Sequence, residues 1–365
     1  MPYSKRRSRL TRLVQRASVD AMLITNFVNV SYLTGFTGDD SFLIVSPQKE
    51  LLITDERYTI QLSEECPSLE LVVRPPGVAI NESVAKVLKS ARIRRLAIEA
   101  ESITVGLLDR LSEKSTQVEF VPTSGAVEEL RMIKDRSEVL ATRRAIDIAE
   151  RAFAVVRAGL RPEQTELEIA NQIDQQIRLF GGTACSFPPI VAVGERSALP
   201  HATPGSKCVG DADLILIDWG AVGSHYTSDL TRVLVTGKIS PKLRKIYGVV
   251  LRAQQRAIRA IRPGRSMAEV DAVARKVIAD AGYAKYFGHG LGHGIGLEVH
   301  EAPRLAPAQK LLLSAGMIVT VEPGIYLPRW GGIRIEDDVL VTKSGHEVLT
   351  GVERELLACV VECGS

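Results

Sequence analysis

The hydrophobic and polar positions of the first 125 residues predict a small unit of strands and helices. Three short apolar runs, at 20–25, 42–46 and 50–54, are separated by turn-forming residues and predict strands. Apolar spacing of three and four residues returns at 81–91 and predicts a helix there. This part of the chain is therefore expected to form a small α/β domain.

The pattern then changes to long amphipathic segments. Residues 128–159 space their apolar side chains three and four positions apart, which predicts one helix ending at Gly159. The same spacing predicts helices at 164–181 and 241–261. These long helices distinguish the rest of the chain from its first part.

Length supports a division at this change of pattern. A chain of 365 residues is too long for a single ordinary core, so two domains are expected. We place the boundary near residue 125, which gives domains over 1–125 and 126–365. The formal charge is only +3, and the basic clusters at 4–12 and 91–95 contain no aromatic side chains. These clusters are interpreted as solvated helix faces, and no nucleic-acid partner is expected.

Cysteines and apolar runs bear on where the protein works. The chain has five cysteines and no CxxC pair, which suits a reducing compartment and indicates a cytoplasmic protein. Charged residues at Arg12, Arg16 and Asp20 interrupt any apolar core of a signal peptide. No apolar run reaches the length of about 18 residues that spans a bilayer, so no membrane partner is expected.

Four acidic residues interrupt apolar strand patterns in the second domain. Asp218 and Asp229 are equally distant from a turn beside Gly223, which predicts a hairpin in which the two acids lie opposite each other. The midpoint of Glu322 and Glu336 falls within the turn-like sequence LPRWGG, which predicts a second hairpin of the same kind.

Opposed carboxylates on buried strands repel each other and lose hydration, so a cation or a shared proton must relieve them. One such pair would be explained by an edge strand that faces solvent. Two similar hairpins beside a histidine cluster instead favour a metal site. Oxygen ligands with one imidazole suit Mn²⁺, Co²⁺, Fe²⁺ or Zn²⁺, and the lack of nearby thiolates argues against structural zinc.

The histidine cluster is the stretch GHGLGHGIGLEVHE, residues 288–301, which holds three of the chain's six histidines. Its glycines make a helix improbable and predict an extended segment that another backbone, a substrate or a metal can approach closely. His289 and His293 would share one face of a strand, whereas His300 must be brought in by a bend. A flexible surface loop is the alternative, and the four acids that await a nitrogen ligand disfavour it.

These motifs resemble the pita-bread metallopeptidases, within the branch of Xaa-Pro aminopeptidases and Xaa-Pro dipeptidases (prolidases). The sequences that carry the resemblance, in the family's order, are SALPHATP, IDWGAVGSHYTSDLTR, GHGLGHGIGLEVHEAPR, VTVEPGIYLP and GIRIEDDVLVT. LITNFVNVSYLTGFTG and LLITDERYT are similar to the family's amino-terminal domain. The resemblance implies an α+β fold, with a creatinase/prolidase-like α/β domain over 1–125 and a pita-bread catalytic domain over 126–365.

The resemblance also implies a role for each matching residue. Two divalent ions, with Mn²⁺ the first expectation, would be bound by Asp218, Asp229, His293, Glu322 and Glu336. Asp229 and Glu336 would bridge both ions. His201 and His300 would act on the scissile amide, and Glu322 would also relay a proton.

Four further residues are expected around the substrate. His289 would line the pocket for the proline side, and Arg304 could meet a substrate carboxylate. Tyr326 and Arg334 would orient the metal carboxylates and the bridging water. The resemblance further implies a homodimer and a proline-containing peptide substrate.

The expected activity is hydrolysis of the bond between an N-terminal residue and proline by metal-activated water. Since only Arg304 would cap the cleft, an aminopeptidase is preferred to a dipeptidase. No GxSxG motif indicates a covalent intermediate. The alternatives are a binding protein that has lost its metal site, which the five intact ligand positions disfavour, and methionine aminopeptidase, which usually lacks the amino-terminal domain.

Overall fold

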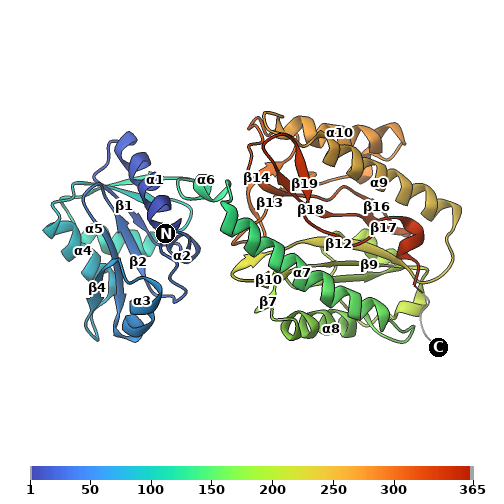
Figure 1. The fold of residues 1–365 in the computed structure, drawn as a ribbon, viewed down its shortest axis with the longest axis horizontal. Helices are drawn as coiled ribbons and strands as arrows, with labels where there is room; N and C mark the ends of the chain where they lie inside the picture. Colours follow the sequence, from blue (N-terminus) through green and yellow to red (C-terminus); the bar gives the residue numbers. More distant parts are fainter. Residues whose placement is uncertain (1, 362–365) are drawn as a thin grey trace. The chain divides into compact units, whose positions relative to one another are not determined.

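The computed structural model describes residues 2–361, and the chain divides into two compact units, Met1–Arg131 and Met132–Ser365 (Figure 1). The division falls after the short helix α6 (Glu128–Arg131), whereas the sequence placed it near residue 125. Both units combine helices with strands, so the predicted α+β class is confirmed.

The first unit is a six-stranded mixed sheet in the order β4-β3-β2-β1-β5-β6. Its strands are β1 (Ala21–Ile24), β2 (Phe42–Val45), β3 (Glu50–Asp55), β4 (Glu70–Arg74), β5 (Arg95–Glu99) and β6 (Glu119–Thr123). Its other helices are α1 (Pro2–Arg16), α2 (Phe27–Thr34), η1 (Glu56–Tyr58), α3 (Thr59–Glu65), α4 (Ile80–Ser90) and α5 (Val105–Lys114). Leu23 and Ile53 pack with α4 and α5 in one apolar core. The three predicted strands and the predicted helix are confirmed.

The basic cluster at 4–12 is helical, but its interpretation as a solvated face is wrong for two residues. Arg6 and Arg7 are buried, and their guanidiniums donate to the carbonyls of Tyr32 and Leu33 at distances of 2.9 Å each. Those carbonyls belong to the last turn of α2, where helix carbonyls have no partner within the helix. Arg7 also pairs with Glu50 at 2.5 Å. The two arginines therefore fix α1 to the end of α2.

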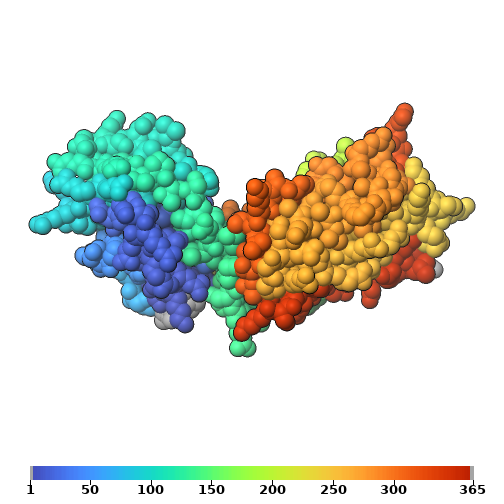
Figure 2. All heavy atoms as spheres, turned by 90° about the horizontal axis from the view of Figure 1, so that it is seen from above, coloured from blue at the N-terminus to red at the C-terminus, as the bar shows by residue number. Residues whose placement is uncertain are grey.

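The second unit packs two helix pairs over several antiparallel sheets. Its helices are α7 (Arg136–Ala158), α8 (Glu166–Leu179), η2 (Gly194–Ala198), η3 (Val209–Asp211), α9 (Pro241–Ala260), α10 (Met267–Asp280), η4 (Ala284–Tyr286) and η5 (Leu356–Cys359). Helix α7 packs against α8, and α9 packs against α10. Figure 2 shows α9 and α10, coloured yellow to orange, covering one outer face of this unit.

The strands of the second unit form one five-stranded sheet and three smaller ones. The orders are β14-β13-β15-β18-β19, β12-β9-β8, β11-β10-β7 and β16-β17. The strands are β7 (Ala184–Cys185), β8 (Ile190–Val193), β9 (Leu214–Trp219), β10 (Ala221–Gly223), β11 (Tyr226–Thr227), β12 (Leu230–Val235), β13 (Gly292–Gly294), β14 (Glu301–Leu305), β15 (Ile318–Val321), β16 (Gly324–Leu327), β17 (Gly331–Arg334), β18 (Asp337–Val341) and β19 (His346–Val348). One apolar core joins these strands to the helices, with Trp219 stacked on Phe153 of α7 at 4.1 Å between ring centroids.

The predicted single helix over 128–159 is two helices, α6 and α7, so that prediction is wrong in its first part. Asp135 interrupts it as the N-cap of α7: its side chain accepts from the backbone of Glu138, while the Glu138 side chain accepts from the backbone of Asp135. The end at Gly159 is confirmed. The helices predicted at 164–181 and 241–261 are α8 and α9.

None of the helices between residues 2 and 361 combines the length and the apolar composition that crossing a bilayer requires. Cys66, Cys185, Cys208 and Cys359 are free thiols, and Cys363 lies outside the described residues.

Candidate active site

The first acidic hairpin forms, but with a register that differs from the prediction. Strands β9 and β12 pair antiparallel with Asp218 opposite Thr231, so the predicted opposition of Asp218 and Asp229 is wrong. The chain reverses at Ser224 and His225, whose φ angles of 53° and 67° place the turn one position later than expected. Asp229 lies two residues before Thr231, so it shares a strand face with Asp218 as a diagonal neighbour.

The second acidic hairpin has the predicted register. Strands β16 and β17 pair with Gly324 opposite Arg334, and β15 and β18 continue the same register. Glu322 and Glu336 therefore lie at equivalent positions where the two pairs of strands meet. The prediction is confirmed because the turn beyond Leu327 is centred on Arg329, as the sequence indicated.

The histidine-rich stretch is not helical, as predicted, and its residues Gly292–Gly294 form the extended strand β13. A side chain at Gly292 would place its Cβ 2.0 Å from the carbonyl oxygen of Thr320, and one at Gly294 would meet that of Ala302 at 2.3 Å. Glycine is therefore required for the neighbouring strands to approach. After β13 the chain bends and brings His300 back to His293, with ring centroids 4.3 Å apart.

Three of the five predicted metal ligands form a compact cluster. The ligand atoms of Asp229, His293 and Glu336 all lie within 4.8 Å of one another. The Nε2 atom of His293 is 3.6 Å from Asp229 Oδ2 and 3.4 Å from Glu322 Oε1. On the other side of the ring, Nδ1 is 3.0 Å from the Gly294 carbonyl, which can only accept. The proton therefore belongs on Nδ1, and the lone pair of Nε2 faces the acids.

Burial disfavours the ionised form of three of these acids when no cation is bound. Burial first, and then Glu336 and the other acids, raises the pKa of Asp229 well above its ordinary value. Burial and the charge of Glu322 do the same for the pKa of Glu336, and burial raises the pKa of Glu322 to about 8. Burial lowers the pKa of His293 to about 4, so its imidazole is neutral near pH 7. A positive charge among these groups would favour the ionised acids.

The residues fit divalent metal ions. Asp218 Oδ1 and Asp229 Oδ1 are buried oxygens without a hydrogen-bond partner in the structure, although buried polar atoms are normally paired. Carboxylate oxygens and one neutral imidazole suit Mn²⁺, Fe²⁺, Co²⁺ or Zn²⁺. No cysteine lines the cleft formed by the described residues.

Metal binding is expected to stabilise the protein against heat. At about 100 times the dissociation constant, a bound ion raises the free energy of unfolding by about 2.7 kcal/mol. For a domain of this size that corresponds to an increase in melting temperature of about 5–10 °C. Circular dichroism melts in EDTA and in MnCl2 measure the effect, with NaCl of equal ionic strength as the control. The expectation would be contradicted if Mn²⁺, Fe²⁺, Co²⁺ and Zn²⁺ each left the melting temperature equal to that in EDTA.

Arg334, Tyr326 and His289 form a hydrogen-bonded wall beside the acids. Arg334 donates to Asp218 Oδ2 at 2.5 Å and to the Tyr326 hydroxyl at 2.9 Å. The Tyr326 hydroxyl is 3.0 Å from Nε2 of His289, whose Nδ1 lies 2.8 Å from the Gly290 carbonyl. Burial raises the pKa of Tyr326 to about 12 and lowers that of His289 to about 4. The Tyr326 hydroxyl therefore stays protonated and donates a hydrogen bond to Nε2 of the neutral His289 imidazole.

One cleft of about 920 Å³ collects every site residue predicted from the sequence. In addition to the groups described above, His201, His300 and Arg304 line it. Strand β13 covers only residues 292–294, so His289 reaches the cleft from a loop and the prediction that it shares a strand face with His293 is wrong. The cleft is also lined by residues that the sequence did not single out, among them Phe187, Pro188, Pro189, Lys285 and Tyr286.

Two threonines beside the acids were missed. Thr231 donates to Glu336 Oε2 at 2.6 Å, and Thr320 donates to Glu322 Oε1 at 3.2 Å. Each is two positions from an acid, Thr231 from Asp229 and Thr320 from Glu322. Side chains two positions apart share a strand face, so this spacing could have revealed both.

Comparison with known proteins gives full-length matches. Residues 141–343 match the model of metallopeptidase family M24, and residues 6–133 match the creatinase/prolidase N-terminal domain. A Xaa-Pro dipeptidase of Pyrococcus furiosus is 35% identical over 97% of this chain and 99% of its own. The structure of a Xaa-Pro dipeptidase from Bacillus anthracis is 40% identical, with a TM-score of 0.93, and covers 97% of this chain and 99% of its own. That of an X-Pro aminopeptidase from Thermotoga maritima is 37% identical, with a TM-score of 0.89 and the same two coverages.

Proposed function

Since the chain belongs to metallopeptidase family M24, with a creatinase/prolidase N-terminal domain, we propose that it hydrolyses the peptide bond between an N-terminal residue and proline. The observation that carries the proposal is the single cleft in which five potential metal ligands lie beside His201 and His300. A binding protein without a metal site is disfavoured, because the acids are buried together and, among the described residues, Arg334 pairs with Asp218 alone of the five potential ligands.

Five side chains would hold two divalent ions: Asp218, Asp229, His293, Glu322 and Glu336. The family resemblance supports Asp229 and Glu336 as the ligands that both ions would share, and the two acids lie with His293 in the compact cluster. Two bound ions would lower the pKa of a water molecule and stabilise the negative charge that develops on the scissile carbonyl oxygen. Arg334 and Thr231 keep Asp218 and Glu336 in place through the hydrogen bonds described above.

His201 and His300 would contact the substrate. Both are exposed at the cleft, where a peptide can reach them. Burial and the neighbouring Arg304 lower the pKa of His300, so its imidazole is neutral near pH 7. A neutral imidazole offers one N–H, which can donate to the carbonyl oxygen of the scissile amide as negative charge develops there.

Glu322 is proposed to move the proton. Its Oε1 atom accepts from Thr320 and faces His293, and the carboxylate has a second oxygen that can take a proton from water. Passing that proton to the departing proline nitrogen would complete hydrolysis without a covalent intermediate.

Proline is proposed to be recognised by shape. The amide nitrogen of proline carries no hydrogen, so a selective site must read the ring. Phe187, Pro188, Pro189 and the wall of His289 and Tyr326 line the cleft with apolar and aromatic surface suited to that task.

We therefore expect kcat/KM for Xaa-Pro substrates to exceed that for matched Xaa-Ala substrates at least tenfold, a difference of about 1.4 kcal/mol. Assays of both series with purified, metal-loaded protein measure the ratio, with methionyl peptides as a control series. Comparable rates on Xaa-Pro and Xaa-Ala would refute proline selectivity and leave a metallopeptidase of broader specificity.

Peptide length separates an aminopeptidase from a dipeptidase. The cleft of about 920 Å³ is at the large end for small-molecule sites and favours the aminopeptidase, which accepts longer chains. Arg304 and the relatives described as Xaa-Pro dipeptidases favour the alternative, a prolidase, because a cation at the cleft can bind the carboxylate of a short substrate. Activity on Xaa-Pro dipeptides and absence of activity on Xaa-Pro tripeptides would shift the assignment to prolidase.

The proposal includes Mn²⁺ as the resident ion, a homodimer and a cytoplasmic location. The family resemblance supports the first two, and the free thiols among the described cysteines support the third. Metal analysis of protein purified without added metal and sedimentation velocity test the first two.

A further inference from the structure

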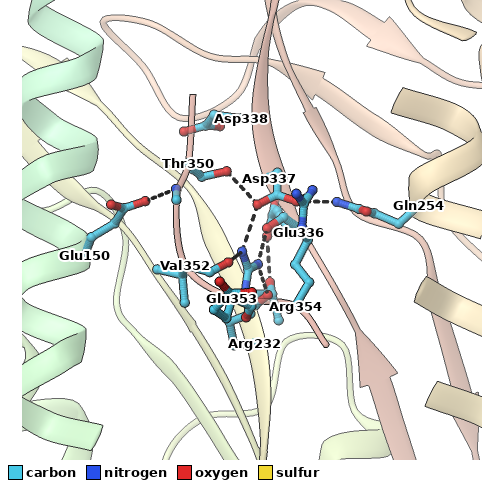
Figure 3. A network of polar contacts seen from close by, with 12 residues as sticks. Glu150, Arg232, Gln254, Glu336, Asp337, Asp338, Thr350, Val352, Glu353 and Arg354 are labelled. Atoms are coloured by element: carbon cyan, nitrogen blue, oxygen red, sulfur yellow. Dashed lines mark hydrogen bonds and ion pairs between the residues drawn. The ribbon is translucent and has the colours of Figure 1, made fainter. Parts of the chain in front are cut away.

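We propose that Arg232 and Asp337 are positioning residues, which lie behind the cleft and fix the backbone that carries Asp229 and Glu336. The inference rests on the proposed function, because it takes those two acids as metal ligands. Figure 3 shows Arg232 and Asp337 at the centre of a network of polar contacts. Neither residue lines the cleft.

The Arg232 side chain is fully buried and uses all its donors. Its five N–H groups make hydrogen bonds to the carbonyls of Glu353 (3.1 Å), Thr231 (2.9 Å), Glu336 (2.5 Å) and Val352 (2.6 Å) and to the carboxylate of Asp337 (2.8 Å). The planar guanidinium therefore joins β12, the residue before β18 and the segment 352–353 in one fixed arrangement.

Asp337 is the fully buried partner of this arginine. Its two oxygens accept from four donors: Arg232 at 2.8 Å, Thr350 at 2.5 Å, Arg354 at 2.8 Å and the side-chain amide of Gln254. With its lone pairs occupied and two guanidiniums beside it, Asp337 has no need of a metal. Its role is to hold Arg232 in place.

The network acts on both shared ligands through the backbone. Glu336 donates its N–H to the Thr231 carbonyl at 3.2 Å, and its own carbonyl accepts from Arg232 at 2.5 Å. The peptide groups on both sides of Glu336 are thus fixed to β12. The side chain of Asp338, which follows Asp337 on β18, accepts a hydrogen bond from the backbone N–H of Asp229 at 3.2 Å. A shift of β18 against β12 would therefore move both acids.

Stability alone does not account for this network. Removing an arginine and a carboxylate from water costs several kcal/mol per ion, and well-packed apolar side chains often replace such pairs without loss. Groups that orient metal ligands, in contrast, typically change metal affinity or activity 10–100-fold when altered. Metal affinity therefore distinguishes positioning from simple packing.

Arg232→Lys is the main test, because lysine keeps the charge but cannot form the five-donor fork. The matched control is Arg7→Lys, which alters a buried arginine of the first unit that also pairs with a carboxylate and donates to a helix carbonyl. Isothermal titration with MnCl2, melting of the metal-free proteins in EDTA, and kcat and KM for an Xaa-Pro peptide are measured for both variants and for the unaltered protein.

We expect Arg232→Lys to weaken Mn²⁺ binding at least about tenfold and to lower kcat at saturating metal by a similar factor, with KM within about twofold. Arg7→Lys should change Mn²⁺ affinity less than about twofold, even if it lowers the melting temperature of the metal-free protein as much as Arg232→Lys does. Unaltered Mn²⁺ affinity in folded Arg232→Lys would overturn the inference and leave the network a packing element.

A second variant keeps the inference testable if Arg232→Lys does not fold. Asp337→Asn has nearly the same shape but replaces an acceptor oxygen with a donor group, so at least one of its four donors loses its partner. The expected result is again a loss of Mn²⁺ affinity of about tenfold or more, and unchanged affinity would overturn the inference.

Failure of the unaltered protein to bind Mn²⁺ would instead refute the proposed metal site, whereas Mn²⁺ binding without Xaa-Pro cleavage would refute only the substrate.

Discussion

Asp229→Asn and Glu336→Gln are each expected to abolish turnover while leaving the fold largely intact. Both acids belong to the compact cluster with His293, and each change removes one negative charge that two cations would share. The amide forms keep the shape of the side chains and relieve the mutual repulsion of the buried acids, so the metal-free proteins should fold. Their metal content after dialysis should fall with their activity.

Metal analysis by mass spectrometry, beside an Xaa-Pro assay and circular dichroism, measures the three effects. Asp147→Asn is the matched control, because Asp147 is exposed on α7 outside the cleft and its loss should change neither metal content nor turnover. Full metal occupancy with normal activity in Asp229→Asn or Glu336→Gln would show that the cluster has been assigned the wrong role.

His201→Ala and His300→Ala are expected to lower kcat by about two orders of magnitude while the metals stay bound. This is the loss typical when a single hydrogen bond to the developing negative charge is removed. Exposure distinguishes these histidines from His293, whose Nε2 faces the acids: both are exposed at the cleft, although the His300 ring lies 4.3 Å from the ring of His293. Their removal should therefore spare the metal site.

Steady-state kinetics at saturating metal and metal analysis of the same samples test this separation. His346→Ala serves as the control, because His346 lies on β19 outside the cleft and its ring forms a hydrogen bond with the Ile261 carbonyl. A variant of His201 or His300 that loses metal together with activity would make that residue a ligand.

The helix and strand positions could mostly be predicted because their signals lie within a few residues. Thr165 is the N-cap of α8: its hydroxyl accepts from the backbone N–H of Glu168, the Glu168 carboxylate accepts from the backbone N–H of Thr165, and both residues are visible in the sequence. Short apolar runs bounded by turn-forming residues likewise predicted the strands near 20–25, 42–46 and 50–54. The second acidic hairpin was predicted with its correct register because its turn near Arg329 is short and central.

The first acidic hairpin could not be predicted as well. Its turn uses positive φ angles at Ser224 and His225, neither of which is glycine, so Gly223 indicated a reversal one position too early. The acids still share one face, because a shift by two residues in the pairing preserves the side on which each side chain lies. The shared face of the two acids was therefore predicted correctly, although their pairing was not.

The sequence by itself determined most of the predicted helices and strands, the family, and the candidate ligands and histidines that line the cleft. These follow from local periodicity and from motifs whose residue types carry their own chemistry. Only the tertiary structure decided which charged residues are buried: Arg6 and Arg7 under α2, and Arg232 against Asp337 behind the acids. A buried charge is tolerated when distant segments supply its hydrogen bonds, and partners such as Gln254, Thr350 and Arg354 come together with Asp337 only once the sheets have packed.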